Sequence, residues 1–484
     1  MTLCSTSILS SALSLLLLTT GQGTANAQSN LPAPSGPTRY NRAPISNELL
    51  EVHLPRAVKR TLPNGVRVLV LEDHHAASIS MIVYINGAGG LFDPADQPGL
   101  ASMTAQMLSL GTSIRTSKQI AQATDTYAAS LNVNAGSSSS TVSLSASGLS
   151  SNFDNWSPIV TDVLLHPSFP ENELATAKQR QLSQLQSQAS DAGFLANKYL
   201  RHTLYGDTPE GVVSATPEST KAFTAEALRS FYRLRYTPQS TIVVIGGDIT
   251  PAKAFAFVSD ALGAWPKTDL QVGLPPVTEV TAPRSVTLVD RPNSVQTNLV
   301  LGRLGIDRRD PDYVKLAVTN NILGSGAAGR LFMRLREEKS YTYGAYGSLD
   351  ATDYRGVITA NSEVRTQVTG GALDEFFHEF SRLGTEPVSL EELKRHKHSM
   401  VAMFALSLES PQTLMGDVFL QERYGFPEDY WDRYAAALAT VSADDVMAMG
   451  KKYYSPETME VIAVGDPEIK PVLAKWGDVK EIKP

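Results

Sequence analysis

The stretch Gly99-Leu100-Ala101-Ser102-Met103-Thr104-Ala105-Gln106-Met107-Leu108-Ser109-Leu110-Gly111-Thr112 decides the fold of this chain. Its apolar side chains recur at the three- and four-residue spacing of a helix with one buried face, at Leu100, Met103, Met107, Leu108 and Leu110. Glycine commonly stands just beyond the end of a helix, as Gly111 does here. We therefore expect a buried helix around which the first part of the chain is organised.

The composition indicates an ordinary water-soluble protein with more than one domain. The 484 residues allow two to four domains with a large core. A hydrophobic content of 42% and a charged content of 19% are typical of such proteins. The net charge of −7 gives no reason to expect nucleic acid as a partner. After the N-terminal region no segment has the length and apolarity of a membrane span, so no membrane association is expected for the mature chain.

The N-terminus has the pattern of a secretory signal peptide. Residues 8–18 form an apolar run, and Ala25-Asn26-Ala27 gives an A-x-A site, which predicts a signal peptide over 1–27 with cleavage after Ala27. The run is too short for an anchor helix. The segment departs from the usual signal-peptide pattern in one respect, because no Lys or Arg precedes Arg39 and its first residues are uncharged. The only cysteine, Cys4, lies inside this segment, so the mature chain has no disulfide and no cysteine-based metal site. We expect a periplasmic or otherwise exported protein.

Alternating and helical patterns predict a mixture of strands and helices. Strands are predicted at 66–71, 79–85 and 241–245, with two more within 128–148. Helices are predicted at 155–165, 171–188 and 224–236.

The same plan occurs twice along the chain. Tyr236-Thr237-Pro238 leads through an apolar strand to Gly247-Asp248, and 218 residues later Tyr454-Ser455-Pro456 leads through another to Gly465-Asp466. The chain is therefore predicted to contain two similar halves. Its expected organisation is a signal peptide, a flexible leader, a first half, a Pro-rich linker and a second half, at 1–27, 28–54, 55–266, 267–283 and 284–484.

The stretch 99–112 resembles the active-site helix of the insulinase (pitrilysin) metallopeptidases, the inverzincins, whose frame is G-L-A-H-x-x-E-H-M-L-x-x-G-T. In that family the two His bind zinc and the Glu is catalytic. Here Ser102 and Gln106 stand at the His positions, and Ala105 stands at the Glu position. The resemblance implies an α+β fold in which two homologous halves form a clamshell around an extended peptide. Each half would have an antiparallel-rich sheet covered by helices.

The third zinc ligand of the family is a Glu on a later helix, in a pattern resembling E-R-x-x-x-L-x-E. This sequence has Ala177-Lys178-Gln179-Arg180-Gln181-Leu182-Ser183-Gln184, with Gln184 at the ligand and Ala177 at a supporting Glu. A zinc hydrolase needs three protein ligands and a base for the bound water. With all five functional side chains replaced, we expect no metal or other cofactor in this chain and no activity of the chain alone. An autonomous metallopeptidase is the disfavoured alternative.

The histidines do not offer a second zinc site. His74 and His75 follow the first predicted strand in a turn, and His396 and His398 are two residues apart on a charged helix, so they do not share a face. We interpret these four as solvent-exposed.

A second motif lies in the second half, in the stretch Gly324-Ser325-Gly326-Ala327-Ala328-Gly329-Arg330-Leu331-Phe332-Met333-Arg334-Leu335-Arg336-Glu337-Glu338-Lys339-Ser340-Tyr341-Thr342-Tyr343. A phosphate loop is disfavoured because the G-K-[ST] ending is missing. The segment resembles the C-terminal family signature G-R-L-F-x-x-L-R-E-x-x-x-x-x-Y, whose Arg and Tyr map onto Arg336 and Tyr343. In the family this pair reaches the substrate beside the zinc, where both groups can donate hydrogen bonds to a peptide carbonyl. The alternative is that Arg336 forms a surface ion pair and Tyr343 packs at a strand start.

The resemblance also implies a function. In the two-subunit branch of the family, which includes mitochondrial processing peptidase, one chain supplies zinc and a non-catalytic chain supplies the Arg/Tyr pair. The expected partner is therefore an H-x-x-E-H-containing catalytic subunit that holds the zinc, and the expected ligand is an extended peptide. The alternative is a peptide-binding or scaffold protein of the same fold with no role in proteolysis. A run at 289–296 also resembles the family and is interpreted as structural.

Overall fold

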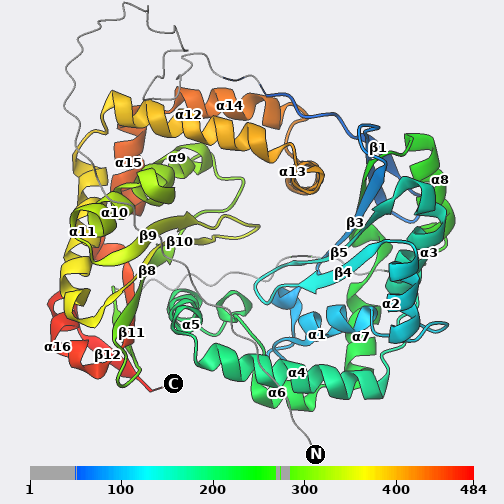
Figure 1. The fold of residues 1–484 in the computed structure, drawn as a ribbon, viewed down its shortest axis with the longest axis horizontal. Coiled ribbons are helices and arrows are strands. Elements are labelled where there is room, and N and C mark those ends of the chain that lie inside the picture. The colour runs from blue at the N-terminus through cyan, green and yellow to red at the C-terminus, as the bar shows by residue number, and fades with distance from the viewer. Residues whose placement is uncertain (1–49, 51, 269–272, 274–283, 484) are drawn as a thin grey trace, which may run out of the picture. The chain divides into compact units, whose positions relative to one another are not determined.

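The computed structural model of the protein describes residues 50, 52–268, 273 and 284–483. The predicted signal peptide, almost all of the predicted leader up to residue 51 and most of the predicted linker lie outside the described residues. The described part contains two six-stranded sheets, each with helices packed against it (Figure 1). This arrangement confirms the expected α+β class with two similar halves.

The first sheet has the strand order β1-β2-β6-β3-β5-β4. Only β2 and β6 pair in parallel, and every other neighbouring pair is antiparallel. The predicted strands are confirmed, and the segment 128–148 is the hairpin of β4 and β5. The bounds are β1 (Val58–Thr61), β2 (Arg67–Glu72), β3 (Ser78–Asn86), β4 (Ser130–Ala135), β5 (Thr141–Leu149) and β6 (Thr241–Gly247).

Helices of the first half include the one predicted at 99–112, which is α1. It ends at Leu108, before Gly111, and its N-terminus is held by Asp93, whose carboxylate accepts hydrogen bonds from the backbone N–H groups of Gly99 and Ala101, each at 2.7 Å. The bounds are α1 (Leu100–Leu108), α2 (Ser117–Thr126), α3 (Phe153–Leu165), α4 (Glu171–Ala189), α5 (Ala192–Tyr205), α6 (Pro217–Ala222), α7 (Ala225–Arg235) and α8 (Pro251–Leu262).

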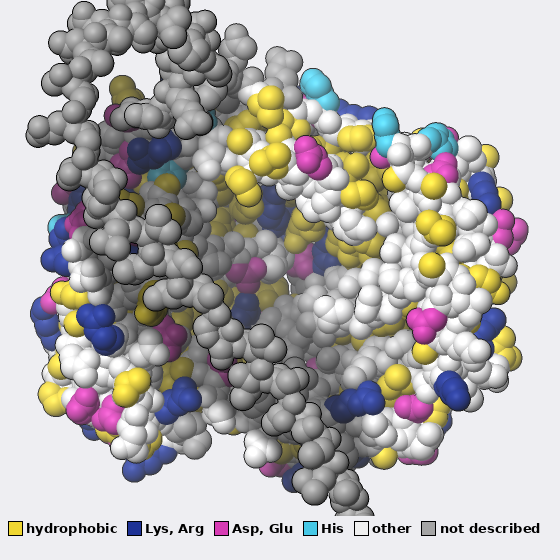
Figure 2. Space-filling view, viewed as in Figure 1, with side chains coloured by type: hydrophobic (Ala, Val, Ile, Leu, Met, Phe, Trp, Pro, Cys, Tyr) yellow, Lys and Arg dark blue, Asp and Glu magenta, His cyan; other side chains and the backbone are white. Residues whose placement is uncertain are grey.

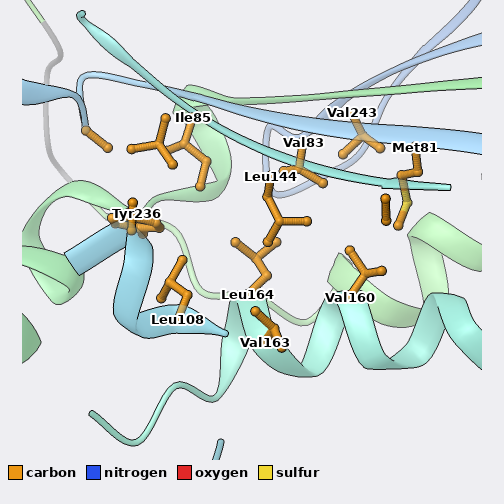
Figure 3. Packing of buried hydrophobic residues seen from close by; sticks show 14 of the residues in the cluster. Met81, Val83, Ile85, Leu108, Leu144, Val160, Val163, Leu164, Tyr236 and Val243 are labelled. Carbon is orange, nitrogen blue, oxygen red and sulfur yellow. The ribbon is translucent and has the colours of Figure 1, made fainter. Parts of the chain in front are cut away.

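The core of the first half lies between one face of its sheet and helices of the same half. Figure 3 shows Leu108 of α1 and Val160 and Leu164 of α3 pointing toward side chains of β3, β5 and β6, such as Val83 and Leu144. These side chains are buried, and burying each one fully stabilises the fold by about 1.5–3 kcal/mol. The predicted burial of α1 is therefore confirmed.

The second sheet repeats the plan with the order β12-β7-β11-β8-β10-β9. As in the first sheet, a central strand pairs in parallel on one side and antiparallel on the other: β11 is parallel to β7 and antiparallel to β8. One difference is the edge strand, since β12 is parallel to β7 whereas β1 is antiparallel to β2. The bounds are β7 (Val286–Asp290), β8 (Gln296–Leu304), β9 (Thr342–Leu349), β10 (Val357–Arg365), β11 (Glu460–Gly465) and β12 (Val479–Ile482).

Helices of the second half such as α9, α11 and α15 cover one face of this sheet. None of the helices in the described residues is long and apolar enough to cross a membrane. The bounds in the second half are α9 (Tyr313–Gly324), α10 (Arg330–Phe332), α11 (Thr369–Thr385), α12 (Leu390–Ser407), α13 (Pro411–Tyr424), α14 (Tyr430–Thr440), α15 (Ala443–Tyr453) and α16 (Lys470–Leu473). A π-helical turn, η6 (Met333–Glu338), follows α10 directly.

The opposite face of each sheet packs against a helix from the other half. Leu195, Leu200 and Leu204 of α5 share an apolar cluster with residues of β8 and β11 in the second sheet. Met415 and Phe419 of α13 share a cluster with residues of β2, β3 and β6 in the first sheet. Because strand side chains alternate between the two faces, each sheet buries both of its faces, one against each half of the chain.

A buried polar network joins the same segments. Arg423, at the end of α13, is only 12% exposed and its Nε donates to Asp353 Oδ1 at 2.9 Å. Its two terminal nitrogens also donate to Asn86, Ser140 and Thr141 of the first half. The guanidinium thus has acceptors from both halves.

Candidate functional site

The positions where the family carries zinc chemistry lie on α1 and α4, which pack against each other. Ser102 and Gln106 are half-buried and four residues apart, so they share one face of α1. Ala105 and Ala177 are fully buried in the core of the first half. Gln184 is exposed on α4. Two of the five positions have thus become part of the hydrophobic core.

The donor set at these positions does not fit a zinc ion. Protein zinc sites use thiolate, imidazole or carboxylate ligands, whereas Ser102, Gln106 and Gln184 offer a hydroxyl and two neutral amides. Ala105 has no group that could take a proton from a bound water. Among the described residues, no group of three or more His, Cys, Asp or Glu is placed to hold a metal ion.

One of the histidine predictions is wrong. His396 is only 2% exposed, and its Nδ1 lies 2.7 Å from Asn321 Oδ1. Burial in this environment lowers the pKa of His396. The charged sequence of this helix favoured exposure, but the face of α12 that carries His396 packs against α9. His74 and His75 are exposed, as expected, and each hydrogen-bonds to neighbouring carboxylates.

Arg336 and Tyr343 lie on either side of an unusual helix end. The turn η6 is π-helical. This geometry is rare in proteins, and where it occurs it is often at a functional site. The turn ends at Glu338, and Ser340, two residues later, has a φ of 56° in the left-handed region. The backbone N–H of Ser340 donates to the carbonyl of Arg336 at 3.0 Å, and that of Tyr341 donates to Leu335 at 2.9 Å. The two bonds span four and six residues and end the helical segment, with Ser340 in the left-handed conformation that glycine more commonly adopts.

The structure brings Arg336 and Tyr343 to one cavity. The cavity has a volume of about 650 Å³ and its lining includes both residues. Tyr343 is 89% exposed, so its ring does not pack into the core at the start of β9. The remaining lining residues come from the start of β8, the turn after η6 and the end of β10: Val295, Gln296, Ser340, Tyr341, Thr342, Glu363, Arg365 and Gln367.

Arg336 differs from the other arginines on its helix. Arg330 bonds both carboxylate oxygens of Glu392 at 2.8 and 2.9 Å, and Arg334 bonds Glu375 and Glu338 at 2.6 Å each. The ion pair of Arg336, with the adjacent Glu337, is longer at 3.6 Å, and its guanidinium also lies 4.7 Å from the centre of the Phe332 ring. At 46% exposure its hydrogen-bond donors remain accessible to a ligand.

Sequence reasoning did not identify the other charged residues of the cavity. Arg365 is 29 residues beyond Arg336 in the chain, and only the pairing of β10 with β8 places it opposite Gln296. Glu363 lies where the register between β10 and β9 shifts. Val295 and Gln296 belong to the run at 289–296, which was interpreted as structural, and both line the cavity.

Charges are mixed over the face of the molecule shown in Figure 2. Among the side chains coloured there, basic and acidic groups are interspersed with polar and apolar ones, and no broad area carries a single sign.

Comparison with known proteins gives consistent results. Residues 67–218 match the family model for insulinase (peptidase family M16), and residues 222–400 match that for the peptidase M16 inactive domain. The chain is 24% identical to the uncharacterized zinc protease YmxG of Bacillus subtilis over 74% of this chain and 86% of that protein. It is 23% identical to a non-peptidase homolog YmxG of Helicobacter pylori, over 72% of this chain and 85% of that protein.

A solved structure has the same fold. The crystal structure of a peptidase M16 inactive domain from Pseudomonas fluorescens superposes with a TM-score of 0.78 at 25% identity, covering 85% of this chain and 98% of that one. Together with the two family models, which cover most of the described residues, this likeness decides the family. The chain belongs to the insulinase family of M16 peptidases, as a non-catalytic member.

Proposed function

We propose that this chain is the substrate-binding, non-catalytic subunit of an exported heterodimeric zinc metallopeptidase. The observation that carries the proposal is a contrast between two sites of this chain, the zinc-site positions and the Arg/Tyr pair. The zinc-site positions hold Ser102, Ala105 and Gln106, whereas Arg336 and Tyr343 are retained and line one cavity.

The role of the pair follows from its chemistry. The guanidinium of Arg336 and the phenol of Tyr343 donate hydrogen bonds to a carbonyl oxygen of an extended peptide and stabilise the negative charge that develops on it. The partner subunit, which contains H-x-x-E-H, holds the zinc that activates the water for peptide hydrolysis. Strand β9, which carries Tyr343, is the last strand of its sheet, so an extended peptide can pair with its free edge.

The test uses the purified mature chain alone and mixed with an H-x-x-E-H-containing subunit. We expect no zinc and no peptide cleavage alone, and cleavage gained or raised on mixing. Arg336→Ala and Tyr343→Phe should each lower turnover of the complex, the former by roughly 10²–10³-fold, while native mass spectrometry shows an intact heterodimer. Arg433→Ala, which removes an arginine that is 74% exposed on α14, is the matched control. Unchanged turnover with Arg336→Ala contradicts the proposal.

A second candidate is a peptide-binding or scaffold protein without a part in proteolysis. The name of the Helicobacter pylori relative, a non-peptidase homolog, favours it. Peptide binding that depends on Arg336, combined with no cleavage in the presence of any H-x-x-E-H subunit, would establish this reading.

A further inference from the structure

The cavity that holds Arg336 and Tyr343 contains a second cation, Arg365, which forms no ion pair with a carboxylate of the described residues. Arg365, at the end of β10, is exposed, and the hydrogen bond that it makes among the described residues runs from Nη1 to the backbone carbonyl of Ser340 at 3.2 Å. That acceptor is neutral. By contrast, Arg330 and Arg334, which precede Arg336 on the same helical segment, bond carboxylates at 2.9 Å or less.

The cavity also has an exposed apolar wall. Val295 is 76% exposed and Tyr343 is 89% exposed, and both line the cavity. A ligand bound in the cavity could exclude water from both side chains, as ligands do at apolar grooves. Val295 lies just before β8 and Arg365 lies at the end of β10, and both line the cavity, so an apolar and a cationic group are offered to one ligand.

The balance of charge sets the ligand class. The charged residues that line the cavity are two arginines, Arg336 and Arg365, and one glutamate, Glu363, and outside the lining Glu337 lies 3.6 Å from Arg336. A basic peptide side chain would meet two like charges, whereas an acidic one gains a charge-assisted hydrogen bond. In the proposed function Arg336 donates to the peptide carbonyl, so Arg365 is the cation that can bind an acidic side chain of the peptide.

We infer that the cavity is a specificity subsite for peptides in which an acidic residue adjoins a bulky apolar one. Arg365 binds the carboxylate, and Val295 with the ring of Tyr343 covers the apolar side chain. Arg365 is thus a specificity-determining residue, and Glu363 limits the affinity for acidic ligands. This inference rests on the proposed function, because it takes the ligand of the cavity to be a peptide.

The test measures binding of fluorescein-labelled peptides to the mature chain alone, by anisotropy. The three probes share one uncharged sequence with a central Leu-Asp, Leu-Asn or Leu-Lys pair. We expect the Leu-Asp probe to bind about tenfold tighter than the Leu-Asn probe and the Leu-Lys probe to bind weakest, with the preference falling at high salt.

Three variants keep the inference falsifiable. Arg365→Gln should abolish the acidic preference, and Arg365→Lys should retain part of it, so a loss caused only by misfolding is recognised. Glu363→Gln should tighten binding of the Leu-Asp probe without affecting folding, because its side chain is exposed. Arg433→Gln is the control for net charge. Equal affinity for the three probes, absence of binding, or a preference that survives Arg365→Gln overturns the inference. Turnover that still depends on Arg336 in the complex would then leave the proposed function standing.

Discussion

Ser340 donates its backbone N–H to the carbonyl of Arg336 at 3.0 Å, from a left-handed conformation with a φ of 56°. This bond follows the π-helical turn η6 and lies between Arg336 and Tyr343 in the chain. The same residue accepts the hydrogen bond from Arg365. The backbone of Ser340 is thus hydrogen-bonded to two residues of the cavity, Arg336 and Arg365, and non-glycine residues in the left-handed region cluster at functional sites.

Replacing Ser340 with glycine should stabilise the protein. A residue with a Cβ pays roughly 1 kcal/mol or more in the left-handed region, and glycine does not. We expect Ser340→Gly to raise the free energy of unfolding in urea by about 1 kcal/mol, less the extra entropy of the unfolded glycine. Ser340→Ala keeps the strain and serves as the control. A lower stability of the glycine variant would show that the serine side chain, rather than the backbone, matters here.

Restoring the family's catalytic Glu should damage the fold. Ala105 is 0% exposed in the core of the first half, so Ala105→Glu places a carboxylate among apolar side chains. We expect a loss of about 3 kcal/mol or more from overpacking and unpaired burial of a polar group. Ser102→His, at a half-buried position of the same helix, should cost less than about 1 kcal/mol. Thermal unfolding of both variants checks the difference, and similar stabilities would contradict the burial argument.

Stability should depend on pH through Asp93. Burial raises the pKa of Asp93 to about 7, against the opposing effect of the N–H donors of Ala101 and Gly99. Its ordinary value is 3.8, so between about pH 4 and pH 7 the folded chain keeps a proton that the unfolded chain has lost. The free energy of unfolding therefore falls as the pH rises through this window, by at most about 1.4 kcal/mol per pH unit from this group.

Asp93→Asn keeps an acceptor at the start of α1 but cannot ionise. Urea unfolding of the variant should show a smaller fall in stability between pH 4.5 and pH 7 than the wild type. Identical pH profiles would mean that the carboxylate is ionised in the fold throughout this range.

The polar network between the two halves should be sensitive to the loss of one partner. Arg423→Ala leaves Asp353, which is 14% exposed, without its cation, and we expect a loss of about 3–5 kcal/mol. The pair of changes Arg423→Gln and Asp353→Asn removes both charges and should cost less than Arg423→Ala alone. Denaturation of the three proteins tests this order. Arg433→Ala breaks an ion pair whose arginine is exposed and should cost less than about 1 kcal/mol.

The sequence predicted the elements of the fold because their signals are local. The period of the apolar residues gave α1 and the strands β2, β3 and β6, and the repeat at 218 residues predicted two sheets of one plan. The end of α1 was missed by a few residues, because Ser109 and Leu110 continue the apolar pattern after the helical backbone has stopped.

The sequence by itself determined the family and the loss of zinc ligands, since both depend on which side chains follow one another in short motifs. Tertiary structure alone decided that Ala105 and Ala177 are core residues, that His396 is buried, and that α5 and α13 each pack on the sheet of the other half. It alone brought Arg365 and Val295 to the cavity of Arg336 and Tyr343. These outcomes depend on strand register and on contacts between residues far apart in the chain, which no local pattern encodes.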